Sequence, residues 1–331
     1  MGSMVPPNKE VSQEIFPYIR VYADGTFLRL AGTEVAPPGL DPATSVLSKD
    51  VPISIPSSKI ELSIRMYIPS SALSATLPPK LPLILYFHGG AFIISSTADP
   101  KYHNSLNAIV SCSESILVSL DYRRCPEHPL PASFDDSWTL LLWILRQSEP
   151  ETPNREPWLE RHADFGRVFL AGDSGGANMA HHLALRVSRS LPGISFPGMI
   201  MIHPYFWGKE PIGKEKENDF GRRMVDGWWR FVCPSSKGND DPLINPFPEG
   251  KCPEGMGEMP VRRVIVMVAA EDMLRDRGRL YYEMLTEKSG WKGKGEMFKT
   301  EGAGHVFHII DHESDKAKDL FKRLSRFINE T

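Results

Sequence analysis

Five short apolar runs, separated by stretches with helical periodicity, constrain the fold of this chain more than any other feature. The runs lack the apolar–polar alternation of a strand with one face in water, so we expect strands that are buried on both faces. They are Leu83–Phe87, Ile116–Leu120, Val168–Ala171, Met199–Ile202 and Val264–Val268. Strands of this kind form parallel sheets covered by helices. The sequence therefore predicts an α/β fold with a mostly parallel central sheet flanked by helices.

Helices are predicted where apolar residues recur at helical spacing between and after these runs. The predicted helices are Ser133–Arg146, Ser174–Arg189, Arg277–Glu287 and Ser314–Asn329. Two strand-like stretches, Asp50–Ile55 and Ile60–Tyr67, come before the parallel part, and the second alternates apolar and polar positions. Such alternation is typical of a half-buried antiparallel strand, so we expect a hairpin at one edge of the sheet.

Two segments interrupt this order within what we expect to be a single domain spanning residues 1–331. The first, about residues 1–45, combines the apolar cluster Ile15–Ile19 with the proline-rich stretch Ala36–Pro42, and we expect it to form a lid. The second, about residues 205–260, is rich in aromatic residues, Pro and Gly and has no run typical of a buried strand. Open α/β sheets bind ligands outside the carboxyl ends of their strands, so we expect this helical insertion to form a cap there.

Composition favours small-molecule chemistry. A formal net charge of −3 and the lack of a dense Lys/Arg block argue against a nucleic-acid partner and against attachment to an anionic membrane. The four cysteines are irregularly spaced and lack the pattern of a zinc site. No charged leader opens the chain, and no apolar run approaches the ~20 residues of a membrane span. We therefore expect a cytoplasmic protein, and its predicted assembly is a monomer or a homodimer.

A serine between glycines is the sharpest local signal. Gly172-Asp173-Ser174-Gly175-Gly176 follows the apolar run that ends at Ala171 and begins a predicted helix. This context fits a nucleophile elbow, in which small neighbours permit a strained turn that exposes the serine hydroxyl. A helix N-cap serine after a tight turn is the alternative interpretation. The strand before it and the helix after it favour Ser174 as a nucleophile.

Backbone amides near this serine are candidates to receive negative charge on a substrate oxygen. The amide of Gly175 lies at the positive end of the predicted helix. His88-Gly89-Gly90-Ala91 follows another predicted strand, and residues without bulky side chains let their amides approach a substrate. A simple strand-ending turn is the alternative for this motif. Together with the serine motif, it predicts an oxyanion hole built from Gly89, Gly90, Ala91 and Gly175.

A serine nucleophile needs a base, and the base needs an acid that fixes its tautomer. In the chain order serine, acid, histidine, Asp272 follows the last apolar run and His305 follows a strand-like stretch, so both belong at the carboxyl edge of the sheet. Glu271 and Asp276 are alternative acids, and His308 is an alternative base. We prefer Asp272 because Asp276 is expected to cap a helix and Glu271, next in the chain, points elsewhere. We prefer His305 because small residues flank it, whereas apolar residues flank His308.

Further stretches, distributed in order along nearly the whole chain, carry a resemblance to a known family. They are Phe16–Val21, His88–Gly90, Asp121–Pro129, Pro157–Leu159, His162–Phe165, Gly172–Asn178, His203–Gly208 and Gly304–His308. Together they resemble the plant carboxylesterase family, in the hormone-sensitive-lipase-like group of α/β hydrolases. The resemblance implies an α/β-hydrolase fold capped by the N-terminal segment and the insertion. It also implies ester hydrolysis without a cofactor, and no metal site is predicted.

The triad of that family maps onto Ser174, Asp272 and His305, and its oxyanion amides map onto Gly89, Gly90 or Ala91, and Gly175. There are two departures: many members have a third glycine where Ala91 stands, and alanine where Gly175 stands. Neither departure removes an amide.

We therefore expect a carboxylesterase that acts, through an acyl-enzyme, on small to medium esters of plant specialised metabolism. A dehydratase or cyclase for a bulky specialised metabolite is the alternative, because the family includes both and fold alone does not choose. A hormone receptor is less favoured, because the receptors of this family have replaced the histidine that stands here as His305. The residues expected to shape the substrate pocket are Phe92, Ile93, Ile94, Trp207 and Trp228.

Overall fold

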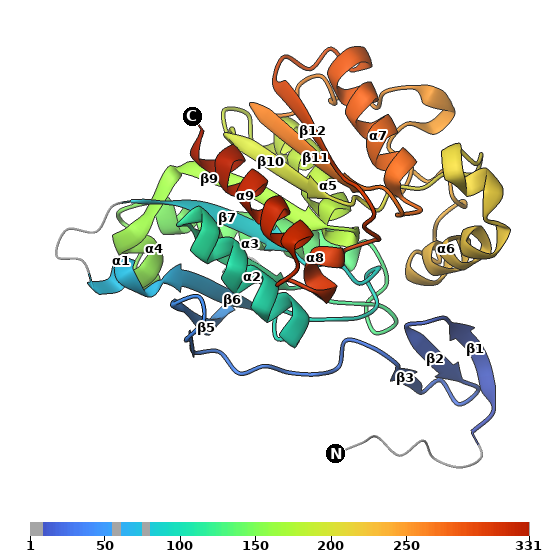
Figure 1. Cartoon of the computed structure of the whole chain (residues 1–331), viewed down its shortest axis with the longest axis horizontal. Coiled ribbons are helices and arrows are strands. Elements are labelled where there is room, and N and C mark those ends of the chain that lie inside the picture. The colour runs from blue at the N-terminus through green and yellow to red at the C-terminus, as the bar shows by residue number, and fades with distance from the viewer. Residues whose placement is uncertain (1–8, 55–60, 75–79, 331) are drawn as a thin grey trace.

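The computed structural model describes residues 9–54, 61–74 and 80–330. Within these residues, nine strands form one sheet, in the order β12-β11-β10-β9-β7-β8-β6-β5-β4 (Figure 1). Their bounds, in that order, are Lys294–Thr300, Arg263–Ala269, Gly198–Ile202, Ala163–Asp173, Leu81–Phe87, Ile116–Asp121, Leu62–Pro69, Val46–Ile53 and Leu40–Asp41. Neighbours from β12 to β8 are parallel, and β6, β5 and β4 follow β8 as antiparallel strands. The predicted α/β class with a mostly parallel sheet is confirmed.

The buried runs of the sequence form the centre of this sheet. Every residue of β7 and of β10 is buried, as expected of parallel strands with helices on both faces. The predicted edge hairpin is the antiparallel pair β5 and β6, which are in register from Val46 opposite Pro69 to Ile53 opposite Leu62. The predicted ends of these two strands at Ile55 and Ile60 lie outside the described residues.

Two sets of helices cover the two faces of the sheet (Figure 1). One face carries α2 (Pro100–Ser113), α8 (Phe307–Ile310) and α9 (Asp315–Asn329), and the other carries α3 (Ala132–Ser148), α5 (Gly175–Ser190) and α7 (Arg275–Glu283). The predicted helix through Glu287 ends as α7 at Glu283 and continues as a π-helix, Met284–Lys288. Nowhere in the described part of the chain is there a helix with the length and apolar character needed to cross a membrane.

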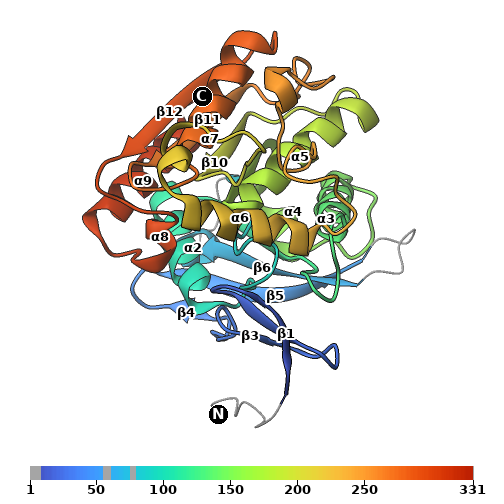
Figure 2. The ribbon, with the colours of Figure 1, turned by 90° about the vertical axis from the view of Figure 1, so that its right-hand side faces the viewer.

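The N-terminal segment and the insertion contribute the remaining elements. The former holds a small antiparallel sheet of β1 (Val11–Ile15), β2 (Ile19–Tyr22) and β3 (Phe27–Arg29), and the latter holds α6 (Asp219–Val232). Short helical pieces complete the described chain: α1 (Ser70–Ser74), α4 (Pro157–His162) and the 3₁₀ turns Gly213–Glu217 and Pro248–Gly250. Figures 1 and 2 show α6 and the small sheet side by side at one end of the molecule.

Candidate active site

Ser174 lies at the sharp turn between β9 and α5. Strand β9 ends at Asp173 and α5 begins at Gly175, while Ser174 between them has a φ of 50°. This left-handed conformation is strained for a residue with a side chain. The turn also requires glycine at two flanking positions. A Cβ on Gly172 would lie 2.4 Å from the carbonyl carbon of Gly176, and one on Gly176 would lie 1.8 Å from a carbonyl oxygen of β7. The local geometry is therefore that of a nucleophile elbow.

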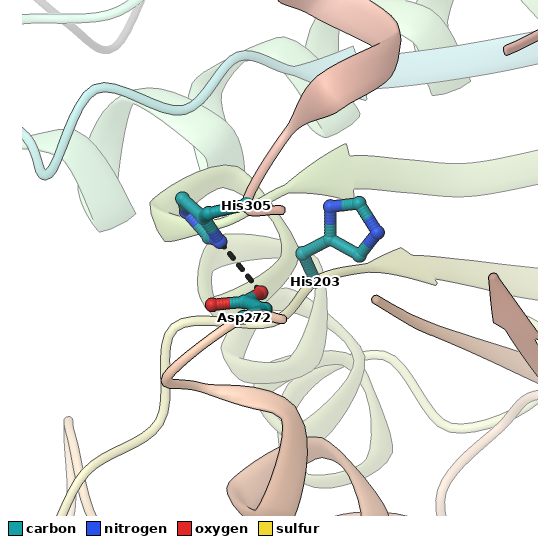
Figure 3. Close-up of side chains that lie close together, drawn as sticks. All are labelled: His203, Asp272 and His305. Carbon is teal, nitrogen blue, oxygen red and sulfur yellow. Dashed lines mark hydrogen bonds and ion pairs between the residues drawn. The ribbon is translucent and has the colours of Figure 1, made fainter. Parts of the chain in front are cut away.

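Two further side chains reach the turn from neighbouring loops. His305 Nε2 lies 3.0 Å from Ser174 Oγ. On the other side of the ring, His305 Nδ1 lies 2.7 Å from Asp272 Oδ2, the contact drawn in Figure 3. A carboxylate only accepts hydrogen bonds, so Nδ1 of His305 carries the proton that it donates to Asp272. Nε2 is then free to accept from the serine hydroxyl. The structure thus brings the three predicted residues together in an arrangement suited to general-base chemistry.

Electrostatics favour the charged form of both members of the Asp272–His305 pair. Burial raises the pKa of Asp272, but the charge and the hydrogen bond of His305 outweigh burial, so this pKa lies below its usual value. Burial lowers the pKa of His305, but the charge and the hydrogen bond of Asp272 outweigh it and raise this pKa above its usual value. Asp272 also accepts a hydrogen bond from the amide of Leu274 at 2.9 Å. An imidazolium formed at His305 is therefore stabilised by its neighbour.

The alternative acids and base lie in other surroundings. The side chain of Glu271 is 63% exposed, and Asp276 pairs with Arg275 at 2.8 Å. His308 is wholly buried, and neither of its ring nitrogens has a hydrogen-bond partner in the described part of the chain. Among the described residues, Ser174 Oγ has its hydrogen-bond contact with His305 and with none of these three.

The loop after β7 packs directly on the serine turn. A Cβ on Gly175 would lie 3.4 Å from the ring of Phe92. Gly90, Ala91 and Phe92 have φ values of 97°, 53° and 62°, so this loop is held in a strained, left-handed path. In the described chain, no carbonyl or side chain accepts from the amides of Gly90, Ala91 or Gly175. The amide of Gly89 differs, because it donates to Tyr102 Oη at 2.8 Å and to Asp173 Oδ1 at 3.1 Å.

Asp173, the residue before the nucleophile, joins this loop to the serine turn. The hydroxyl of Tyr86 donates to Asp173 Oδ1 at 2.9 Å, and that of Tyr102 donates to Asp173 Oδ2 at 2.8 Å. Burial raises the pKa of this carboxyl to about 6, although the hydrogen bonds from both tyrosines lower it. Sequence reasoning missed this network, because the two tyrosines lie on β7 and α2 and only Asp173 belongs to the serine motif. The amide of Gly89 donates its hydrogen bonds within this network, which holds the loop in place.

Asp272 and His305 also form a group with His203, and each of the three offers a ligand atom within 4.8 Å of the others (Figure 3). Such a spacing could hold a metal ion. His305 Nδ1 and Asp272 Oδ2 are already bonded to each other, and His203 Nδ1 accepts from the amide of Val306 at 3.0 Å. An ion bound through these atoms would have to displace those hydrogen bonds. The absence of a metal stays a prediction.

Comparison with known proteins places this site in a family. A family model of the α/β-hydrolase fold matches residues 84–309. The chain is 50% identical over 327 residues to "Probable carboxylesterase 2" of Arabidopsis thaliana, covering 99% of both proteins. It is 42% identical over 316 residues to "Probable carboxylesterase 7" of the same plant, covering 95% of this chain and 96% of that protein. The chain belongs to the plant carboxylesterase family of α/β hydrolases. This membership confirms the predicted family, fold and enzyme type, that of serine hydrolases.

Other members and structures extend the comparison. This chain is 38% identical to "Tuliposide A-converting enzyme 1, chloroplastic" of Tulipa gesneriana, covering 96% of this chain and 78% of that protein. Among solved structures, a thermostable esterase from Pseudomonas putida has a TM-score of 0.71 at 19% identity, covering 86% of this chain and 83% of that one. The esterase of Pyrobaculum calidifontis has a TM-score of 0.68 at 22% identity, covering 86% and 85%. At these identities, the two structures show the shared fold.

The five residues expected to shape the substrate pocket differ in exposure. Ile93 and Trp207 expose no surface, Phe92 exposes 1% and Ile94 exposes 9%. The indole of Trp207 donates to a carboxylate, Asp226 Oδ1, at 2.7 Å. Trp228 is partly exposed on α6. A ligand would touch Ile93 and Trp207 only after a rearrangement, and the substrate role of all five stays a prediction.

Proposed function

We propose that this chain is a carboxylesterase in which Ser174 is the nucleophile, His305 the general base and Asp272 the residue that orients the base. The observation that carries the proposal is the continuous hydrogen-bonded path from Ser174 Oγ through both nitrogens of His305 to Asp272, with distances of 3.0 and 2.7 Å. Relatives named as probable carboxylesterases match the chain over almost its full length.

In the proposed mechanism, Ser174 Oγ attacks the ester carbonyl carbon while His305 Nε2 takes the hydroxyl proton. The amides of Gly90, Ala91 and Gly175 donate to the oxyanion, each contributing roughly 3 kcal/mol to the transition state. His305 then gives its proton to the leaving alcohol, and an acyl-enzyme on Ser174 remains. Water deprotonated by the same imidazole attacks the acyl carbon, releases the acid and restores the hydroxyl.

For the substrate we propose small to medium esters of plant specialised metabolism, covered by the N-terminal lid and the cap. A relative is named as converting tuliposide A, which supports this class. The indole of Trp228 on α6 donates to the carbonyl of Phe16 at 2.9 Å, and its ring centroid lies 5.0 Å from that of Tyr18. These contacts join the two covering segments. The cytoplasmic location and the monomeric or homodimeric assembly stay predictions.

The test is the hydrolysis of a para-nitrophenyl ester combined with a fluorophosphonate probe. We expect the wild type to cleave the ester and to be labelled on Ser174, whereas Ser174→Ala does neither. Ser188→Ala, which changes a partly buried serine of the same helix, is the matched control and should behave as wild type. Ester cleavage that survives in Ser174→Ala would contradict the proposal and indicate that water, deprotonated by the base, attacks the ester directly without an acyl-enzyme.

A further inference from the structure

We infer that His203 is a positioning residue that holds the loop carrying His305 in its working geometry. This inference rests on the proposed function. It begins from a contact that the triad does not include: His203 Nδ1 accepts the backbone N–H of Val306, the residue after His305, at 3.0 Å. Figure 3 shows the two imidazoles and the Asp272 carboxylate grouped together. The ring centroids of His203 and His305 are 5.9 Å apart.

The backbone of His203 is itself fixed to the sheet. The residue directly follows β10, and its N–H donates to the carbonyl of Met267 in β11 at 2.9 Å. The residue exposes only 1% of its surface, so its side chain is buried. The side chain that accepts from the His305 loop is therefore anchored at the end of β10, the neighbour of the strand β9 that leads into Ser174, and is tied to β11 on the other side.

The hydrogen bond to His203 is donated by a residue whose backbone conformation is strained. Val306 has a φ of 46°, and a β-branched residue in this left-handed region is a genuine outlier. Such strain persists only where the surroundings over-determine the conformation. The carbonyl of Val306 accepts from the amides of Ile309 and Ile310 in α8, and its own N–H donates to His203. The two peptide groups that flank the Cα of Val306 are thus each held by hydrogen bonds.

The neutral state of His203 suits this task. Burial lowers its pKa to about 3, with Asp272 acting to raise it and His305 to lower it. The neutral ring with its proton on Nε2 leaves the Nδ1 lone pair free to accept from Val306. A cationic ring would replace this acceptor with a donor and would add positive charge beside the imidazolium that forms on His305 during the reaction.

Two substitutions separate the acceptor from the bulk of the ring. His203 has a φ of 46°. Asparagine tolerates such a positive φ and carries an oxygen bonded to Cγ, as Nδ1 is in histidine, so His203→Asn keeps the hydrogen bond. His203→Phe keeps a planar ring and removes the acceptor. His181→Phe is the matched control, because His181 is also buried and its ring bonds to Tyr281 Oη on α7, 3.0 Å away, with no contact to the His305 loop among the described hydrogen bonds.

We expect His203→Phe to lower kcat for a para-nitrophenyl ester about 100-fold with little change in KM, because a displacement of about 1 Å at a catalytic group costs that much. His203→Asn should recover most of this loss, and His181→Phe should keep the wild-type kcat. Amide hydrogen exchange, measured on the same proteins, should be faster at residues 305–308 in His203→Phe alone. If the phenylalanine variant does not fold, His203→Leu, which is smaller and also lacks an acceptor, replaces it.

A wild-type kcat in His203→Phe, equal losses in the phenylalanine and asparagine variants, or unchanged exchange at residues 305–308 would each overturn the inference. The exchange measurement needs no turnover, so it decides the inference even for a protein that cleaves no ester. If the wild type has no esterase activity, the proposed function is contradicted, and the inference about His203 is still decided by hydrogen exchange.

Discussion

Replacing Asp272 by asparagine moves the ring proton of His305 from one nitrogen to the other and preserves the shape of the site. Asp272 accepts from the amide of Leu274 at 2.9 Å through one oxygen and from His305 Nδ1 at 2.7 Å through the other. The carbonyl oxygen of an asparagine keeps the contact with the Leu274 amide. Its NH₂ group then points toward His305. Because an NH₂ group only donates, Nδ1 must become the acceptor and the ring proton must move to Nε2. The base then faces the serine hydroxyl with a proton instead of a lone pair.

The size of the effect distinguishes this mechanism from the loss of one hydrogen bond. A wrong tautomer with intact geometry lowers kcat about 10⁴-fold, which corresponds to about 5.5 kcal/mol at the transition state. Loss of a charge-assisted hydrogen bond alone is worth about 1.5–3 kcal/mol, or roughly a 10- to 100-fold change. We therefore expect Asp272→Asn to lose about four orders of magnitude in kcat toward a para-nitrophenyl ester.

Glu271→Gln supplies the control for this experiment. Glu271 directly precedes Asp272 in the chain, yet its side chain is 63% exposed, so removal of its charge should leave kcat unchanged. An Asp272→Asn enzyme that keeps about a hundredth or more of the wild-type kcat, or an equal loss in Glu271→Gln, would refute the reasoning about the tautomer.

Three further predictions follow from the same contacts. Because the pKa of His305 is raised and the base must be neutral, kcat/KM should rise with pH with a midpoint above the usual histidine value of about 6.5, and a pH–rate profile measures this midpoint. Glu215 is wholly buried and bonds Arg277 at 2.6 and 2.7 Å, so Glu215→Gln should lower the free energy of unfolding in urea by about 3–5 kcal/mol. Gly176→Ala should prevent folding, because its Cβ would lie 1.8 Å from a carbonyl oxygen, whereas Gly175→Ala meets a ring at 3.4 Å and should leave both kcat and the melting temperature unchanged.

The central sheet could be predicted because the burial of each strand determines the residue types within that strand. Every residue of β7 is buried, so each position needs an apolar side chain or another group that can be buried. This pattern is visible in the sequence without coordinates. The three residues Ser174, Asp272 and His305 could be proposed for a related reason. Each follows a predicted strand, and parallel strands bring their carboxyl ends to one edge.

Helix α2 was not predicted, because its buried face carries polar groups. His103, Ser105 and Asn107 are buried there with apolar residues, so the periodicity that identifies an amphipathic helix is weak. The burial of His103 depends on a partner elsewhere in the chain, the hydroxyl of Tyr67, which lies 3.3 Å from His103 Nδ1 and which the sequence does not reveal. The use of the Gly89 amide by Asp173 and Tyr102 is hidden for the same reason.

The most direct test of the central claim is the intact mass of the protein after a brief pulse of para-nitrophenyl acetate, quenched in acid and followed by peptide mapping. The account predicts a protein that is one acetyl group heavier, with that group on the peptide containing Ser174, and no such adduct on Ser174→Ala. An acetyl group carried by another residue, or release of nitrophenol by a protein that never becomes acetylated, would contradict it.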